Sequence, residues 1–309
     1  MVNDSIDFAH VSKAIFYPPA INQFLVNYSE FINEQLVGMR IHDKYKVLDL
    51  LKKNFYSKVY LVKDERANKI YEMYVFGNKD NLKVGGIIDF CVDMYRSNLE
   101  HCLIPQIKEI YEDKENIYFI REYVTGDMLR EFICSNGAQN TEIVVQWGRE
   151  LCEAFILMHS LKNHYVYFAL NADNVNVVEG KVLKLQQFEI IIRTREIDDD
   201  TCCLLYSNGY AAPEEFGRIG EQDERTTVYR IGVLMHIMMT ESNPMEPPYE
   251  LLPIREINPD LPKRLEKIIS KCIQPNPAER YQSCKELLED LINYQNYSKG
   301  ILRWIKNFI

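Results

Sequence analysis

The polar residues with the clearest capacity for chemistry lie between Tyr165 and Glu189, in the stretch YVYFALNADNVNVVEGKVLKLQQFE. The pattern predicts two short β segments on either side of a tight turn at Glu179-Gly180, preceded by the polar loop Asn171-Ala172-Asp173-Asn174. Asp173 in this loop and Glu189 at the end of the stretch carry carboxylates, and carboxylates beside a loop commonly serve as solvated or capping groups. The neutral amide of Asn174 would be a poor magnesium site by itself, because Mg²⁺ is usually bound through carboxylates.

Composition and charge exclude several classes of protein. The chain has 309 residues and a formal net charge of −9, which argues against a general nucleic-acid binder because such proteins need a dense basic surface. The eight cysteines include no C-x-x-C pair and the six histidines have no metal-ligand spacing, so we predict free thiols and no metal. The first residues lack the features of a signal peptide, and no apolar run is long enough to cross a bilayer. We therefore expect a cytoplasmic protein.

The elements that must position the polar residues change character near Gly126. Before it, β-branched and aromatic residues predict strands within 45–76, 103–110 and 116–123, and a helix at 80–100 that Gly85-Gly86 interrupts. After it, apolar spacing predicts helices at 142–161, 225–240 and 262–273, a capping box at Ser283 to Glu286, and an irregular segment at 190–209. This order predicts an α+β protein, with a small antiparallel β-rich lobe, a larger helical lobe and a cleft between them.

Each end of the chain adds a further predicted helix. Apolar residues between 20 and 38 make one helical stripe, which fits packing on the following domain or binding of a partner. Residues 299–309 combine an apolar face with three positive charges and no acidic residue. Such a segment could lie on a membrane surface, anchor a partner or pack against the helical lobe, and three charges would bind a membrane only weakly.

The order and spacing of several motifs resemble the eukaryotic-type (Hanks-type) Ser/Thr protein kinase domain over residues 45–295. Residues 209–214, GYAAPE, are similar to the end of an activation segment, and Arg280 matches the arginine that pairs with the glutamate, here Glu214. Residues 122–126, EYVTG, resemble the hinge between lobes. The resemblance implies a two-lobed kinase-like fold, divided into a helical extension (1–44), an N-lobe (45–124), a C-lobe (125–295) and a basic amphipathic C-terminal helix (296–309).

The motifs that carry kinase chemistry are replaced. In the family, catalysis depends on positioning and charge neutralisation, so it needs particular charges at particular places. The resemblance places Tyr74 where the phosphate-binding lysine belongs, Ala169 where the catalytic aspartate belongs and Gln187 where the metal-binding aspartate belongs. The three glycine positions of the phosphate loop fall on Lys52, Asn54 and Ser57, whose side chains should obstruct a close approach. Asn174, the second metal-ligand position, remains.

Two opposite charges fall within the adenine pocket that the resemblance implies. Glu72 takes the position of the alanine that caps the purine, Arg121 takes the gatekeeper position, and Asn176 takes the position of the aliphatic floor. A buried charge without a partner costs several kcal/mol, so we predict that Glu72 and Arg121 pair, with Tyr74 and Asn176 packed nearby.

The leading hypothesis is a catalytically inactive pseudokinase that acts as a scaffold or allosteric regulator through an unidentified protein partner, with neither nucleotide nor metal as cofactor. The candidate contact surfaces are the helix at 20–38, the segment 190–209 and the C-terminal helix. One alternative is an ATP- and magnesium-dependent kinase, or another nucleotide transferase, using the displaced residues Asp173, Glu189 and Asn174. Another is a sensor that binds an anion or small ligand near Lys52 and Lys53.

Overall fold

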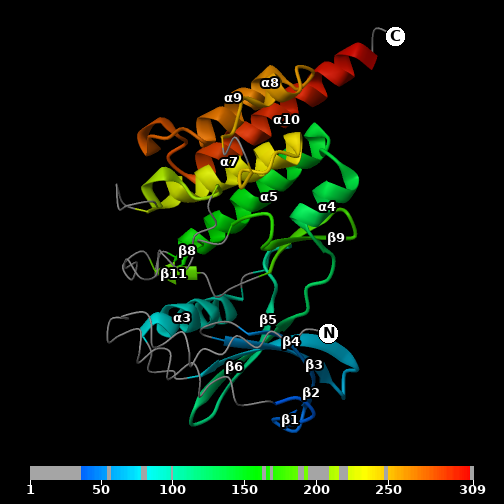
Figure 1. The fold of residues 1–309 in the computed structure, drawn as a ribbon, viewed down its shortest axis with the longest axis vertical. Coiled ribbons are helices and arrows are strands. Elements are labelled where there is room, and N and C mark those ends of the chain that lie inside the picture. The colour runs from blue at the N-terminus through cyan, green and yellow to red at the C-terminus, as the bar shows by residue number, and fades with distance from the viewer. Residues whose placement is uncertain are drawn as a thin grey trace.

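The computed structural model describes residues 36–53, 57–77, 82–98, 100–161, 165–167, 170–186, 191–193, 209–215, 222–246 and 250–306. Figure 1 shows a β-rich part at one end of the long axis and a helical part at the other. This is the two-lobed α+β architecture that the sequence predicts. Nearly all of the predicted helix at 20–38 lies outside the described residues, as do Asn54, Ala169, Gln187 and Glu189.

The β-rich lobe contains one six-stranded antiparallel sheet with the strand order β1-β2-β3-β4-β6-β5. Its strands are β1 (Arg40–Ile41), β2 (Tyr45–Lys53), β3 (Ser57–Asp64), β4 (Lys69–Gly77), β5 (Ile107–Glu112) and β6 (Asn116–Glu122). The turn between β3 and β4 is stabilised by the Asp64 carboxylate, which accepts hydrogen bonds from the backbone N–H groups of Arg66 and Ala67. Because β1 pairs with β2, the sheet begins within the stretch predicted as a helical extension.

Two predicted boundaries in this lobe differ from the structure. Helix α3 (Leu82–Ser97) runs through Gly85-Gly86 without interruption. Glycine weakens a helix by about 1 kcal/mol relative to alanine, and burial of Ile87, Phe90 and Met94 farther along the helix offsets that cost. Strand β5 begins at Ile107 and not at 103, because the preceding residues form a turn in which Ile104 N–H donates to the His101 carbonyl at 3.1 Å.

The helical lobe follows the predicted order of helices. Its elements are α4 (Leu129–Asn136), α5 (Thr141–Ser160), α7 (Glu224–Thr240), α8 (Ile254–Ile257), α9 (Lys263–Cys272) and α10 (Cys284–Lys306), with short 3₁₀ helices η2 (Pro213–Glu215) and η3 (Pro277–Glu279). Helix α7 is buried along nearly its whole length, as its apolar sequence predicts. It forms the centre of the core together with α5, α9 and α10.

Within the described residues, the remaining short strands are β7 (Asp127–Met128), which precedes α4, and four strands between α5 and α7. Strands β9 (Val175–Val178) and β10 (Val182–Leu185) form the predicted hairpin, and β7 pairs with β9. Strand β8 (Tyr165–Tyr167) pairs with β11 (Ile191–Arg193), so the segment 190–209 is not irregular throughout. At the other end of the lobe, α10 is one continuous helix and not two, because residues 284–306 contain no helix-breaking proline.

Candidate functional site

Glu72 and Arg121 form the buried ion pair that the sequence predicts. They are directly opposite each other in the register of β4 and β6, so their side chains leave the sheet on the same face. The Arg121 Nε and Nη2 atoms donate to Glu72 Oε2 at 2.8 and 2.5 Å, and the exposed fractions of the two residues are 0% and 3%. Each charge is therefore neutralised by the other inside the protein.

Tyr74 completes a cluster that joins the two lobes. The Arg121 guanidinium lies 4.5 Å from the centre of the Tyr74 ring, which is a favourable cation–π arrangement. The Tyr74 hydroxyl donates to the carbonyl of Gln186 at 3.2 Å, and Arg121 Nη2 donates to the same carbonyl. Gln186 directly follows β10, so residues of the β-rich lobe hold the backbone just before Gln187, the residue predicted to take the position of the metal-binding aspartate. We call Glu72, Tyr74, Arg121 and the Gln186 carbonyl the interlobe cluster.

Asn176 and Asn174 are buried on the other side of the predicted cleft. Asn176 Nδ2 donates to the carbonyl of Gly126 at 3.1 Å, so this side chain binds the hinge. That Asn176 packs beside Glu72 and Arg121 stays a prediction. The backbone carbonyl of Asn174 accepts a hydrogen bond from Gln186 N–H at 2.9 Å, which further fixes the end of β10.

The phosphate-loop positions are only partly described. Lys52 and Lys53 are exposed at the end of β2, whereas Ser57 is completely buried at the start of β3. Asn54 lies between them, outside the described residues. The exposed lysines remain candidates for an anion site.

Asp173 is a candidate for a displaced catalytic base and lies within the described residues. It binds an arginine, Arg130, that sequence reasoning missed. Arg130 Nε and Nη2 donate to the two Asp173 carboxylate oxygens at 2.6 and 2.8 Å. Arg130 Nη2 also donates to the hydroxyl of Tyr210 at 3.1 Å. Burial, together with the nearby carboxylate of Asp173 and despite the positive charge of Arg130, raises the pKa of Tyr210 to about 12, so its hydroxyl stays protonated at neutral pH.

Glu214 and Arg280 form the expected structural ion pair of the helical lobe. The Arg280 Nη1 and Nη2 atoms donate to the two Glu214 oxygens at 2.7 and 2.8 Å, and both side chains are buried. Burial acts to raise the pKa of Glu214, but the hydrogen bonds from Arg280, Thr226 and the backbone, together with the positive charge of Arg280, outweigh it and hold that pKa below its usual value. The pair joins η2 to the loop that precedes α10.

A second buried ion pair beside it was not predicted. Arg230 Nη2 donates to Glu215 Oε1 at 2.7 Å, and the two side chains are each 2% exposed. Arg230 Nη1 also lies 3.4 Å from the carbonyl of Leu170, at the start of the polar loop. The available signal was the position of Arg230 among the apolar residues in the middle of α7, because a buried charge requires a partner.

These features define a protein with a kinase-type two-lobed fold and intact structural ion pairs. The protein kinase domain model matches residues 45–299. The chain therefore belongs to the protein kinase domain family.

Individual relatives agree with this assignment. The chain is 24% identical over 274 residues to a probable serine/threonine-protein kinase of Clostridium acetobutylicum and to the serine/threonine-protein kinase PrkC of Bacillus subtilis, covering 84% and 83% of this chain. It spans 41% of the length of each of these relatives. Among solved structures, the kinase domain of Mycobacterium tuberculosis PknI matches with a TM-score of 0.62 and 18% identity, covering 84% of this chain and 99% of that domain.

The fold family implies a metal-bound nucleotide in the cleft, and the described residues do not fit one. Glu72 and Arg121 are already neutralised by each other, and Tyr74, predicted to take the position of the phosphate-binding lysine, donates to the Gln186 carbonyl. Asn176 Oδ1 is buried with no hydrogen-bond partner among the described residues, where the family has an aliphatic side chain.

Within the described part of the chain, no helix could span a membrane. The cytoplasmic location remains a prediction.

Proposed function

We propose that this chain is a pseudokinase, which uses a kinase fold to contact other proteins and does not transfer phosphate. The observation that carries the proposal is the buried Glu72–Arg121 pair, which replaces the residue types that normally accommodate the purine. The substitutions at Tyr74, Ala169 and Gln187 support it from the sequence, because each removes a charge on which phosphoryl transfer depends.

The interlobe cluster gives this proposal a mechanism. In an active kinase the nucleotide bridges the lobes, whereas here Arg121 and Tyr74 reach the Gln186 carbonyl and supply such a bridge from the protein itself. The lobes would then keep one arrangement without a ligand and present a constant surface to a protein partner. Residues 20–38 and 190–209 and the C-terminal helix remain the proposed contact surfaces.

The alternative of an active transferase has less support. It needs a displaced carboxylate to accept a proton from the attacking hydroxyl, and the Asp173 carboxylate already accepts two hydrogen bonds from Arg130. Glu189 lies outside the described residues, so its part in this alternative stays open. The anion-sensor alternative rests on the exposed Lys52 and Lys53.

Thermal unfolding with and without ATP and magnesium tests the proposal. A ligand at 100 times its dissociation constant would stabilise the fold by roughly 2.7 kcal/mol, a readily measured rise in Tm. We expect no rise for the natural protein and no incorporation of labelled phosphate. A rise with metal-nucleotide would contradict the filled cleft, and labelled product would establish a transferase. A rise with inorganic phosphate alone, lost in a Lys52→Gln/Lys53→Gln variant, would favour the sensor.

A reopened variant provides the matched comparison. Replacing Glu72 with Ala and Arg121 with Met removes both charges together, gives position 72 the alanine of the family and gives position 121 an uncharged side chain. We expect this variant to gain a Tm shift with an adenine nucleotide in the absence of metal. If the natural protein and the variant respond equally, the Glu72–Arg121 pair is not what prevents binding.

A further inference from the structure

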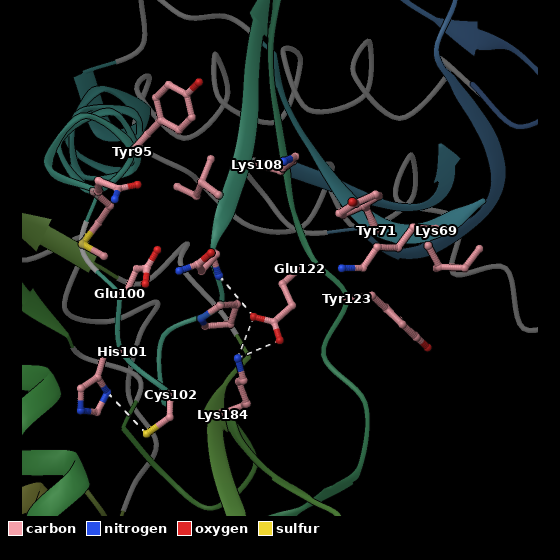
Figure 2. Close-up of a pocket in the computed structure, with 16 residues that line it drawn as sticks. Lys69, Tyr71, Tyr95, Glu100, His101, Cys102, Lys108, Glu122, Tyr123 and Lys184 are labelled. Atoms are coloured by element: carbon pink, nitrogen blue, oxygen red, sulfur yellow. Dashed lines mark hydrogen bonds and ion pairs between the residues drawn. The ribbon is translucent and has the colours of Figure 1, made fainter. Parts of the chain in front are cut away.

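A cavity of about 860 Å³ lies behind the hinge, away from the degenerate nucleotide cleft. Residues from the start of β4, the end of α3, the segment 100–108, the hinge and β10 line it, and Figure 2 shows Tyr95 and Tyr123 on opposite sides of this group. Tyr71 and Glu122 line the cavity and are opposite each other in the β4–β6 register, next to the register pair Glu72 and Arg121. Because neighbouring side chains in a strand point to opposite faces, the cavity and the interlobe cluster lie on opposite faces of these strands.

Two exposed tyrosines add flat ring faces to a cavity whose lining is mainly polar. Tyr95 at the end of α3 and Tyr123 in the hinge are 44% and 38% exposed. Among the side chains that the structure describes, no other tyrosine, phenylalanine or tryptophan is exposed to this degree. Both of them lining one cavity is a feature of binding sites, because aromatic rings supply a large contact area at a small cost in side-chain entropy.

The charges around the cavity are not balanced. Lys184 is paired with Glu122, with its Nζ atom 2.8 and 2.7 Å from the two carboxylate oxygens (Figure 2). Lys69 and Lys108 line the same cavity, are exposed, and form no ion pair with any residue in the described part of the chain. The carboxylate of Glu100 also lines the cavity, so lysines outnumber carboxylates in the lining by one. In a protein with a net charge of −9, two lysines left without carboxylate partners beside exposed tyrosines form a local site for a negative group.

We propose that this cavity binds a small organic anion with a flat apolar body, of the class of aromatic carboxylates. One of the two tyrosine rings would contact the flat body, and Lys69 and Lys108 would attract the negative group. The volume is within the range of small-molecule pockets, which is about 300–1,000 Å³. This inference is independent of whether the nucleotide cleft is filled. The two sites are on the same strands, but no side chain of the interlobe cluster lines the cavity.

Titration of the full chain with indole-3-acetate, followed by ligand-observed NMR, tests the proposal. Indole-3-acetamide is the matched probe, since it keeps the flat body and lacks the charge. We expect the acetate to bind more tightly than the acetamide. The variant Lys69→Gln/Lys108→Gln should weaken acetate binding about fivefold or more, the upper range for exposed charge pairs, and leave acetamide binding unchanged. Lys46→Gln, an exposed lysine on β2 outside the cavity, should change neither.

A second variant tests the aromatic part of the site. Tyr95→Ser/Tyr123→Ser changes only exposed side chains, so the fold should tolerate it, and it should weaken both probes to a similar degree. Absence of saturable binding up to millimolar acetate would overturn the proposal. Acetate binding that all three variants leave unchanged would place the bound molecule elsewhere and would also overturn it.

Discussion

At the scale of single residues, Glu72 and Arg121 form a buried ion pair at positions that the proposed function assigns to the purine site. Their combined hydrogen bonds satisfy most of the polar atoms that burial removes from water. The value of such a pair lies mainly in the cost of breaking it, because a single remaining charge stays buried without a partner. Loss of either residue alone would therefore strongly lower the stability of the fold.

A double-mutant cycle tests this asymmetry. Arg121→Met or Glu72→Leu alone should lower the free energy of unfolding by roughly 3–5 kcal/mol, whereas the double variant should recover most of that loss. Urea unfolding followed by circular dichroism measures all four proteins. The exposed pair of Arg40 and Glu65, whose side chains are 61% and 38% exposed, is the control and should give a coupling below about 1 kcal/mol. Additive losses at Glu72 and Arg121 would contradict the buried pair.

At the scale of elements, buried charges connect segments that are far apart in sequence. The Glu214–Arg280 pair fixes η2 against the loop before α10, and Thr226 at the start of α7 donates to the same carboxylate at 2.9 Å. Because the pKa of Glu214 is lower in the folded state than its usual value, its ionised form stabilises the fold at neutral pH.

This linkage predicts a specific pH dependence. The stabilisation is complete above the usual glutamate pKa of about 4.3 and is lost as the pH falls through the lower, folded-state pKa. The Arg280→Met variant lacks the guanidinium that lowers the pKa, so the difference in unfolding free energy between it and the natural protein should be largest at neutral pH. Urea unfolding at a series of pH values should show that difference shrinking on acidification. A constant difference would mean that Arg280 acts through packing alone.

The hinge depends on one glycine that packs directly against β9. Gly126 has a φ of +93°, and an added Cβ would lie 2.2 Å from the carbonyl oxygen of Val177. Gly38 has a similar φ of +87°, with no atom within 4 Å of the corresponding position. Gly38→Ala should therefore cost only the backbone strain, roughly 1–2 kcal/mol, whereas Gly126→Ala should cost a further 1–3 kcal/mol from the backbone clash. Thermal unfolding of the two variants gives the comparison, and equal losses would show that the hinge can move away from β9.

At the scale of the whole molecule, the helical core encloses thiols that report on global opening. Cys152, Cys272 and Cys284 come from α5, α9 and α10 and are completely buried, whereas Cys102 and Cys134 are exposed. Burial raises the pKa of all three core thiols, so the reactive thiolate is scarce even apart from the steric protection.

Alkylation with iodoacetamide, read by mass spectrometry, tests this arrangement of the core. In native buffer Cys102 and Cys134 should be modified, and Cys152, Cys272 and Cys284 should react only when denaturant unfolds the helical lobe. The raised pKa of Cys102, caused mainly by partial burial, should slow its reaction without protecting it. Reaction of the core cysteines at the rate of the exposed ones in native buffer would show that α5, α9 and α10 separate readily.

The sequence by itself determined the kinase-like order of elements, the Glu72–Arg121 pair and the Glu214–Arg280 pair. Glu72 and Arg121 could be paired because they lie in predicted strands that the fold places side by side, where register fixes which side chains meet. Only the tertiary structure decided that Arg130 engages Asp173, that Arg230 pairs with Glu215, and that Arg121 and Tyr74 both reach the Gln186 carbonyl. These contacts join separate elements through long side chains and a backbone carbonyl. The hydrophobic pattern predicts neither the conformation of a long side chain nor the direction of a carbonyl group. The cavity behind the hinge depended on the tertiary structure for the same reason, since its lining comes from five separate segments.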